Sequence, residues 1–342
     1  MYYDQRWHCG LGFMAATHIK AYRQIPDARI AAICNPSGRH LDGDFSSIAG
    51  NVGSNELIKL DMRSVTAYRD ANELLRDPHI DLIDICAPTY AHAGLCVGAL
   101  NAGKHVICEK PLARSAKLAQ TIAHAAEKAK GYFMPAMCLR FWPEWTWLKQ
   151  TIDQRAYGKV LAARFRRVAE PPAWGQKNFF DGKESGGALF DLHIHDTDFV
   201  QFCFGRPQTV YATGYVKFSG AIDHVVTQYT VASGAVVHAE GGWAMTKGFG
   251  FHPSYTVNFE NATADYDLIR GAQALKLFEK DRDPRAITLH APDGYVGELS
   301  HMIQAIKEGH PPTVVTAREA QSAVEICEAE EQSIRLRKPV FL

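Results

Sequence analysis

The sequence predicts an α/β protein in which a doubly wound parallel sheet is followed by a second, strand-rich α+β region. Three observations predict this fold class. A glycine-rich turn lies near the start, helix-like and strand-like segments alternate up to about residue 134, and the later strand-like segments include a hairpin turn at residues 232–234. Alternation is typical of a parallel sheet covered by helices, and hairpins pair strands antiparallel. We therefore expect two domains, residues 1–134 and residues 135–342.

The composition is that of an ordinary globular protein: 342 residues, of which 46% are hydrophobic and 22% are charged. The 37 basic and 37 acidic side chains balance, so charge favours neither nucleic acid nor an anionic membrane as a partner. No apolar run approaches the length of a membrane span, and the first nine residues lack the apolar core of a signal peptide. The eight cysteines form no CxxC pair, so we expect a reduced, cytoplasmic protein.

The glycine-rich turn has the pattern GxGxxA and precedes a helix-like run and then a buried strand. Glycine lets the backbone turn tightly and approach a pyrophosphate, and the following helix N-terminus attracts that negative charge. The preceding residues lack the Val/Ile/Leu run of a central parallel strand, so we expect an irregular first strand. The predicted cofactor-binding residues of this turn are Gly10, Gly12, Phe13, Met14 and Ala15.

Asn35 stands at the end of the second strand, where a dinucleotide-binding fold usually has an acid that accepts hydrogen bonds from the ribose of NAD. An amide does not repel a 2′-phosphate, and Ser37 and Arg39 offer donors to one. The cofactor is therefore predicted to be NAD(P), with NADP favoured. The alternative for Arg39 is an ordinary solvated side chain.

Lys110 follows a predicted strand directly, in the sequence Glu109-Lys110-Pro111. Ligands of doubly wound sheets bind at the carboxyl ends of strands, so this lysine is predicted to lie where substrate meets cofactor. The alternative is an exposed lysine at a turn. Residues 41–65 look like a surface insertion. The other elements expected in this half are strands at 30–34, 65–68, 80–87 and 105–108 and helices at 71–76 and 91–101.

Asp191 and His195 are spaced four residues apart in a segment that Gly186-Gly187 is expected to open as a helix. That spacing on an α-helix places a carboxylate beside an imidazole, which suits the removal of a proton from an alcohol. The alternatives are a carboxylate that favours the helix start and a buried structural histidine. A metal site would also draw on His193, Asp196 and Asp198, but residues two apart do not face each other on a helix, and we predict no metal.

Aromatic side chains gather between the two predicted domains, near Arg140. Trp142 and Trp174 could hold a sugar or polyol ring by apolar contact while the arginine supplies hydrogen bonds. Core packing is the alternative, and it is favoured for Trp145 and Trp147. The second half is expected to contain strands at 160–168, 209–217, 225–231, 235–243, 255–259 and 339–342 and helices at 298–308 and 317–337.

Five segments together carry a resemblance that covers nearly the whole chain: residues 10–15, 87–92, 102–113, 186–196 and 293–299. The chain resembles the glucose-fructose oxidoreductase / inositol dehydrogenase (Gfo/Idh/MocA) family of NAD(P)-dependent oxidoreductases. The Glu-Lys-Pro motif joined to the Asp-x-x-x-His motif is far more specific than the glycine turn. The resemblance implies an N-terminal Rossmann domain and a C-terminal domain with a large open, mainly antiparallel sheet, whose exposed face would pack against another subunit in a homodimer or homotetramer.

The resemblance also implies roles for individual residues. Lys110, Asp191 and His195 match the family's catalytic lysine, aspartate and histidine. The loop beside the cofactor would contain Pro88, Thr89 and His92, with Glu109 as the acid of the Glu-Lys-Pro motif. The predicted substrate-binding residues are Arg140, Trp142, Trp174, Asp191, His195 and Tyr295.

The expected reaction moves a hydride between the nicotinamide and a secondary alcohol or ketone of a sugar, cyclitol or related polyol. His195 would take the alcohol proton, Lys110 would stabilise the developing alkoxide and Asp191 would orient His195. Two alternatives remain open: a non-catalytic dinucleotide-binding regulator of the same fold, and an enzyme that uses bound NAD in glycoside cleavage.

Overall fold

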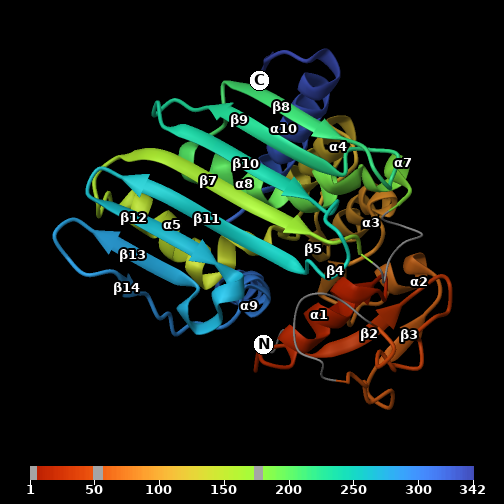
Figure 1. Ribbon diagram of the computed structural model, residues 1–342. Coiled ribbons are helices and arrows are strands. Elements are labelled where there is room, and N and C mark those ends of the chain that lie inside the picture. Colours follow the sequence, from red (N-terminus) through yellow and green to blue (C-terminus); the bar gives the residue numbers. More distant parts are fainter. Residues whose placement is uncertain (1–5, 49–56, 173–179) are drawn as a thin grey trace. The chain divides into compact units, whose positions relative to one another are not determined.

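The computed structural model describes residues 6–48, 57–172 and 180–342, with side chains described from residue 10 onward (Figure 1). The chain divides into two compact units: residues 1–138 with 293–321, and residues 139–292 with 322–342. The predicted boundary between functional domains at 134/135 stays a prediction. Within the described ranges, no helix combines the length and the apolar character needed to cross a membrane.

The first unit contains a six-stranded parallel sheet with the strand order β3-β2-β1-β4-β5-β6. Two halves run outward from β1 in opposite directions, so β1 lies at the switch point where doubly wound sheets bind their ligands. This confirms the predicted parallel sheet. Its strands are β1 (Arg6–Cys9), β2 (Ile30–Cys34), β3 (Thr66–Tyr68), β4 (Leu82–Ile85), β5 (His105–Glu109) and β6 (Phe133–Ala136).

The first strand forms in spite of its unusual sequence. β1 pairs in parallel with β2 on one side and β4 on the other, with a register irregularity between Arg6 and Trp7. Backbone hydrogen bonds to two neighbours do not depend on Val, Ile or Leu side chains, so the strand persists with one local departure from regular pairing. The expectation of an irregular strand is correct in that one place.

Among the described residues, five helices belong mainly to the first unit, and the last of them comes from the C-terminal part of the chain. That helix, α9, packs against α1. The sequence pattern showed α9 as a helix but not the unit to which it returns. The helices are α1 (Phe13–Tyr22), α2 (Ala71–Leu75), α3 (Thr89–Asn101), α4 (Ala116–Lys128) and α9 (Gly294–Glu308).

Part of residues 41–65, expected as a surface insertion, belongs to the core. Phe45 and Ile58 are each 2% exposed and pack with Ile19 of α1 and Ile33 of β2. Glycines and polar residues dominate this stretch, so its apolar contacts with the core were not apparent from the sequence. The expectation was therefore wrong for these two positions.

The second unit contains a nine-stranded sheet with the order β14-β13-β12-β11-β7-β10-β9-β8-β15. Only β7 and β10 pair in parallel, and the other neighbours are antiparallel, which confirms a mainly antiparallel sheet. Strands β12 to β14 were not predicted. The bounds are β7 (Val160–Ala169), β8 (Thr209–Tyr215), β9 (His224–Thr230), β10 (Val236–Gly242), β11 (Phe251–Phe259), β12 (Ala262–Asp267), β13 (Leu275–Glu279), β14 (Arg285–Ala286) and β15 (Val340–Phe341).

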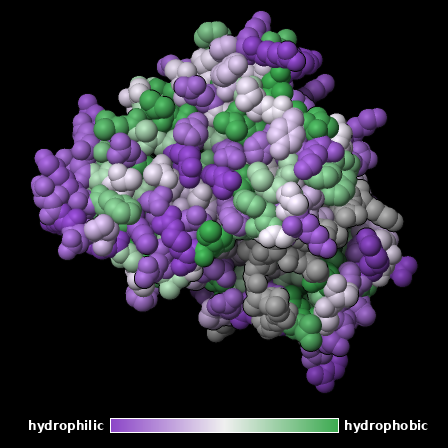
Figure 2. Space-filling view, in the orientation of Figure 1, coloured by the Kyte–Doolittle hydropathy of each residue, from purple (hydrophilic) through white to green (hydrophobic). Residues whose placement is uncertain are grey.

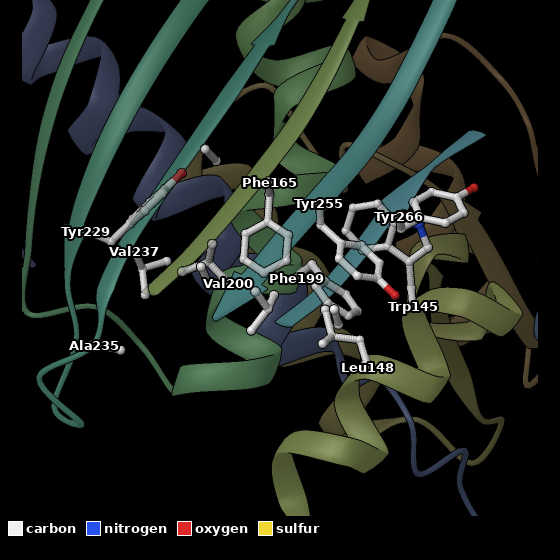
Figure 3. Close-up of a cluster of buried hydrophobic side chains, with 14 of the residues drawn as sticks. Trp145, Leu148, Phe165, Phe199, Val200, Tyr229, Ala235, Val237, Tyr255 and Tyr266 are labelled. Carbon is white, nitrogen blue, oxygen red and sulfur yellow. The ribbon is translucent and has the colours of Figure 1, made fainter. Parts of the chain in front are cut away.

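One face of this sheet forms the core of the unit against α5 (Pro143–Asp153), α8 (Ile194–Phe204) and α10 (Ala317–Leu336). Figure 3 shows side chains from the helices and the strands interleaved there, with Trp145 among aromatic rings. Its ring lies edge-on to Phe199, with centroids 4.8 Å apart. At 1% exposure, Trp145 is a core residue, as expected.

The opposite face of the sheet exposes apolar side chains among polar ones. Figure 2 shows them as green patches scattered between purple residues. Burial alternates along β9, where buried Val225 and Thr227 flank exposed Val226. Tyr215, Leu161 and Val236, on three other strands or strand ends, are also exposed.

Candidate active site

The glycine turn of the first unit is built for close backbone approach. Gly10 has φ +88°, and a Cβ there would lie 2.6 Å from Ala87 Cα and Cys86 O, so only glycine fits. A Cβ on Gly12 would meet nothing within 4 Å. This open space lies at the N-cap of α1, whose first turn carries no acidic side chain. The turn therefore fits a pyrophosphate group.

Of the remaining residues of the turn, one is buried and two are half-buried. Ala15 is fully buried, which lets α1 pack closely on the sheet. Phe13 and Met14 are half-buried in the first turn of the helix. These placements are compatible with the predicted cofactor contacts, which stay predictions.

The turn after β2 is organised by Asn35. Its Nδ2 donates to Arg39 O at 2.9 Å, and its Oδ1 accepts from Ser37 N at 3.2 Å and Ser37 Oγ at 2.9 Å. Ser37 and Arg39 are exposed. Sequence reasoning missed Arg69, whose Nη2 would lie 2.9 Å from a Cβ on Gly38. Only the parallel pairing of β2 with β3 brings this second guanidinium to the turn.

The loops after β4 and β5 are linked through His92. The imidazole is 1% exposed, with Nε2 2.9 Å from Ala87 O and Nδ1 2.9 Å from Pro111 O. Burial lowers the pKa of His92 although two carbonyl oxygens face its ring. Pro88 caps α3 and Thr89 begins it. His92 therefore fixes the two loops to each other.

Glu109 ends β5 and Lys110 follows it. Glu109 is 5% exposed, and its Oε2 accepts from the Lys110 backbone N–H at 3.0 Å. Lys110 itself is half-buried. The carboxyl ends of β4 and β5 are adjacent, since Ile85 pairs with Cys108. The lysine thus lies at the strand-end position that the sequence predicted.

In the second unit, the segment with Asp191 and His195 differs from the expected single α-helix. Gly186 adopts a left-handed conformation that ends α7 (Gly182–Ser185), and a π-helix (Leu189–His193) precedes α8. A π-turn offsets the hydrogen-bonding from i+4 to i+5, so two residues four apart no longer stack as they do on an α-helix. The expected α-helical basis for this pair was therefore wrong, and π-turns recur at functional sites.

The pattern of burial along this segment also distinguishes Asp191 and His195. From Leu189 to Gln201 every side chain is buried except Asp191, Leu192 and His195, which are half-buried. A helix buried nearly all round that leaves a carboxylate and an imidazole accessible presents these two groups selectively. This exposure supports the candidate site without the α-helical spacing.

His193, considered as a metal ligand from the sequence, is engaged inside the second unit. Its Nε2 lies 3.2 Å from Tyr229 Oη and 3.4 Å from Glu330 Oε2. Tyr229 Oη also donates to Glu330 Oε1 at 2.7 Å. A Cβ on Gly241 would come within 2.6 Å of the imidazole, so the histidine packs directly on the β10 backbone.

Asp196 and Asp198 are each paired with a buried arginine. Arg167 Nε donates to Asp196 Oδ2 at 2.9 Å. Arg140 Nε and Nη2 donate to the two oxygens of Asp198 at 2.8 and 2.7 Å. These contacts hold α8 against β7 and the turn Cys138–Phe141, so an ion on these carboxylates would have to displace an arginine.

The predicted substrate-binding residues are dispersed. Arg140 is 2% exposed and committed to Asp198, a placement that argues against substrate contact. Trp142 is half-buried and packs against the hydrophobic core. Tyr295, 9% exposed, belongs to α9 of the first unit, with its ring 6.2 Å from that of His18. Trp174 lies outside the described residues.

A cluster of ionisable side chains behind the Glu109-Lys110 segment was missed from the sequence. His18 Nδ1 lies 2.8 Å from Asp84 Oδ2 and 3.6 Å from Cys86 Sγ. His18 Nε2 lies 3.2 Å from Glu109 Oε1. These residues come from α1, β4 and β5, and no spacing in the sequence joins them.

Two family models match the chain. The model of the oxidoreductase family with an NAD-binding Rossmann fold (GFO_IDH_MocA) matches residues 8–137, and the model of the GFO/IDH/MocA C-terminal domain matches residues 145–265. The two matches fall in the order that the resemblance predicted and cover most of the chain.

Individual relatives agree with the family models. The chain is 25% identical to the myo-inositol 2-dehydrogenase of Thermotoga maritima over 97% of both chains. It is 28% identical to the inositol 2-dehydrogenase of Rhizobium meliloti over 85% of this chain and 80% of the relative. A levoglucosan dehydrogenase solved with NADH superposes with a TM-score of 0.81 at 20% identity, covering 99% of this chain and 98% of the other, which shows the shared fold. The chain belongs to the Gfo/Idh/MocA oxidoreductase family, with an NAD-binding Rossmann domain.

Proposed function

We propose that the protein is an NAD(P)-dependent dehydrogenase or reductase acting on a secondary alcohol or ketone of a sugar, cyclitol or related polyol. The observation that carries the proposal is the selective exposure of Asp191 and His195 on a segment whose other side chains, Leu192 excepted, are buried. Relatives named for inositol and levoglucosan support this substrate class. The glycine turn, with room at Gly12, supports dinucleotide binding.

In the proposed reaction, the nicotinamide, when bound, exchanges a hydride with the carbinol carbon. His195 takes the hydroxyl proton as the general base, and Asp191 orients the imidazole and stabilises its charged form. Lys110 donates to the same oxygen and stabilises the negative charge that develops on it. In the reduction direction the imidazolium returns the proton.

NADP is the proposed preference of the cofactor site. Asn35 replaces the usual ribose-binding acid, and its hydrogen bonds hold Ser37 and Arg39 in one turn. Arg69 adds a second guanidinium beside that turn. Two exposed cations without an acid at this point favour a 2′-phosphate over a free 2′-hydroxyl.

Homo-oligomer formation, as a dimer or tetramer, is proposed through the exposed face of the large sheet. Val236 is 58% exposed and Tyr215 is 47% exposed on this face, so a second copy would remove apolar surface from water. Light scattering that detects only monomer at micromolar concentration would contradict this part. We also propose a cytoplasmic location and the division of labour between residues 1–134 and 135–342.

The test is an absorbance screen at 340 nm of sugars and cyclitols with NAD and NADP in both directions. We expect turnover of at least one polyol, with NADP giving the lower KM. His301→Ala is the control for the substitution of His195. His301 lies on α9, where its Nε2 accepts from the backbone N–H groups of residues 313 and 314, so its loss should leave turnover in place. Binding of dinucleotide without turnover of any polyol would contradict the proposed activity.

A further inference from the structure

A buried histidine, His18, contacts Glu109, the residue that directly precedes Lys110. His18, on α1, is fully buried, as is Asp84 on β4, and Glu109 at the end of β5 is 5% exposed. The two ring nitrogens face two different carboxylates: Nδ1 is 2.8 Å from Asp84 Oδ2 and Nε2 is 3.2 Å from Glu109 Oε1. The first contact is a hydrogen bond, and the second is an ion-pair contact with poorer alignment.

This arrangement requires a particular protonation state. A neutral imidazole has one N–H donor and one acceptor, so it would turn a lone pair toward one of the two carboxylates. An imidazolium donates from both nitrogens. Burial by itself lowers the pKa of His18, but the charge of Asp84, together with the hydrogen bonds to Asp84 and Cys86 and the electrostatic influence of Cys86, raises the pKa well above its usual value. His18 therefore carries its positive charge at neutral pH.

Several acidic groups surround His18, but burial keeps Glu298 and Cys86 neutral. Glu298, on α9, is fully buried, neither of its oxygens has a hydrogen-bond partner among the described residues, and burial raises its pKa well above the usual value. Burial also raises the pKa of the Cys86 thiol. One cation thus serves two carboxylates, while the remaining acids stay neutral. The ionisable groups that face His18 are Asp84 from β4, Cys86 directly after β4, Glu109 from β5, and Tyr295 and Glu298 from α9.

Glu109 links His18 to Lys110, the proposed catalytic lysine. Its Oε1 faces His18, while its Oε2 accepts from the Lys110 backbone N–H at 3.0 Å. One carboxylate therefore joins the imidazolium to the main chain of the lysine. Movement of the Glu109 side chain would leave the start of the Lys110 segment without this hydrogen bond.

We propose that His18 is a positioning residue for the reaction: as an imidazolium held by Asp84, it fixes the Glu109 carboxylate and through it the main chain of Lys110. This inference rests on the proposed function, which makes Lys110 a catalytic residue. The charge state of His18 does not rest on it and can be measured separately.

The first experiment measures that charge state in the intact protein by ¹H–¹⁵N NMR of the histidine side chains. We expect one imidazole, assigned to His18 by its loss in His18→Gln, to keep both nitrogens protonated at pH 7.5. Asp84→Asn removes the dominant counter-charge, so the same ring should become neutral at that pH. A singly protonated ring in the wild type overturns the proposal, as does one equivalent of tightly bound transition metal in place of the proton.

The second experiment measures kcat and KM for His18→Gln and Glu109→Gln. We expect kcat to fall about ten- to a hundredfold in both, since small displacements of a catalytic group cost about that much, with KM for substrate changing less. His105→Gln is the matched control: His105 begins the same strand, and its Nδ1 accepts from Tyr132 N at 2.9 Å. It should retain wild-type kcat.

The two experiments keep the proposals distinguishable. Wild-type kcat in folded His18→Gln and Glu109→Gln overturns the positioning role even when the NMR result is as expected. If His18→Gln does not fold, Glu109→Gln tests the same step from the other partner. Full activity in Lys110→Ala would instead contradict the proposed function, and the protonation state of His18 would stand on its own NMR measurement.

Discussion

The two units hold their candidate catalytic groups in different ways. In the second unit, the helix that carries His195 is fixed by separate buried pairs, Arg167 with Asp196 and Arg140 with Asp198. In the first unit, one imidazolium, His18, serves the carboxylates of Asp84 and Glu109. An arginine keeps its charge at any physiological pH, whereas a histidine does not. We therefore expect pH to act on the candidate catalytic groups through the first unit. Truncation of a charged side chain should act through the buried ion pairs of the second unit.

The largest effect is expected at the second unit's accessible histidine. His195→Ala should lower kcat by about 10²- to 10⁴-fold, the usual contribution of positioned proton transfer. Cofactor affinity, measured by fluorescence titration of NADPH, should stay within about twofold, because the proposed cofactor residues belong to the other unit. Equal losses in both measurements would show a folding defect, and near-wild-type turnover would remove His195 from the mechanism.

Arg140→Ala tests whether the second unit depends on individual ion pairs. The change leaves Asp198 as a buried, unpaired charge, so the free energy of unfolding should fall by about 3–5 kcal/mol in chemical denaturation. The matched control is Lys307→Ala, which removes the exposed ion pair with Asp27 and should cost about 1 kcal/mol or less. A loss of substrate affinity at unchanged stability would instead restore Arg140 to the substrate site.

These differences also mark what the sequence can predict. The parallel sheet was predictable because its signals are local: a glycine turn, buried strands and short helices in alternation. Lys110 was placed correctly for the same reason, since it directly follows β5. The role of Arg140 was not predictable, because its partner Asp198 is 58 residues away and an arginine beside a tryptophan resembles a binding group.

The remaining discrepancies have similar physical causes. A π-turn changes which backbone groups pair without a distinctive residue pattern, so Asp191 and His195 were selected by residue type on an α-helical spacing that the structure does not contain. The His18 cluster draws on α1, β4, β5 and α9, and only the folded sheet joins them. Part of the insertion at 41–65 belongs to the core, because apolar residues such as Phe45 and Ile58 are scattered among its polar ones.

A smaller effect is expected at the cofactor turn of the first unit. Arg69→Ala should raise the Kd for NADPH by about 10- to 150-fold, since a charge-assisted hydrogen bond is worth about 1.5–3 kcal/mol, and leave the Kd for NADH nearly unchanged. Arg76→Ala, on the residue that caps α2, is the control for loss of a nearby positive charge. If Arg69→Ala weakens both dinucleotides equally, the guanidinium acts on the shared part of the cofactor and not on a 2′-phosphate.

The smallest expected effect is the pH dependence of the free energy of unfolding. It tests the comparison of the two units most directly. Burial raises the pKa of Glu298, so its contribution to stability is fully present below its unfolded value near 4.5 and is lost as pH rises through the folded pKa. His18, with a raised pKa, adds a loss in the same direction above about pH 6.5. These two groups therefore make the free energy of unfolding decline from pH 5 toward pH 9, while His92, whose pKa burial lowers, acts in the opposite direction.

Glu298→Gln removes one of these two titrations while keeping a neutral side chain of the same shape. Its free energy of unfolding should decline less steeply between pH 5 and pH 9 than that of the wild type, by at most about 1.4 kcal/mol per pH unit, the limit for one proton. Parallel curves for Glu298→Gln and the wild type would mean that Glu298 is ionised in the fold, and that His18 balances three carboxylates instead of two.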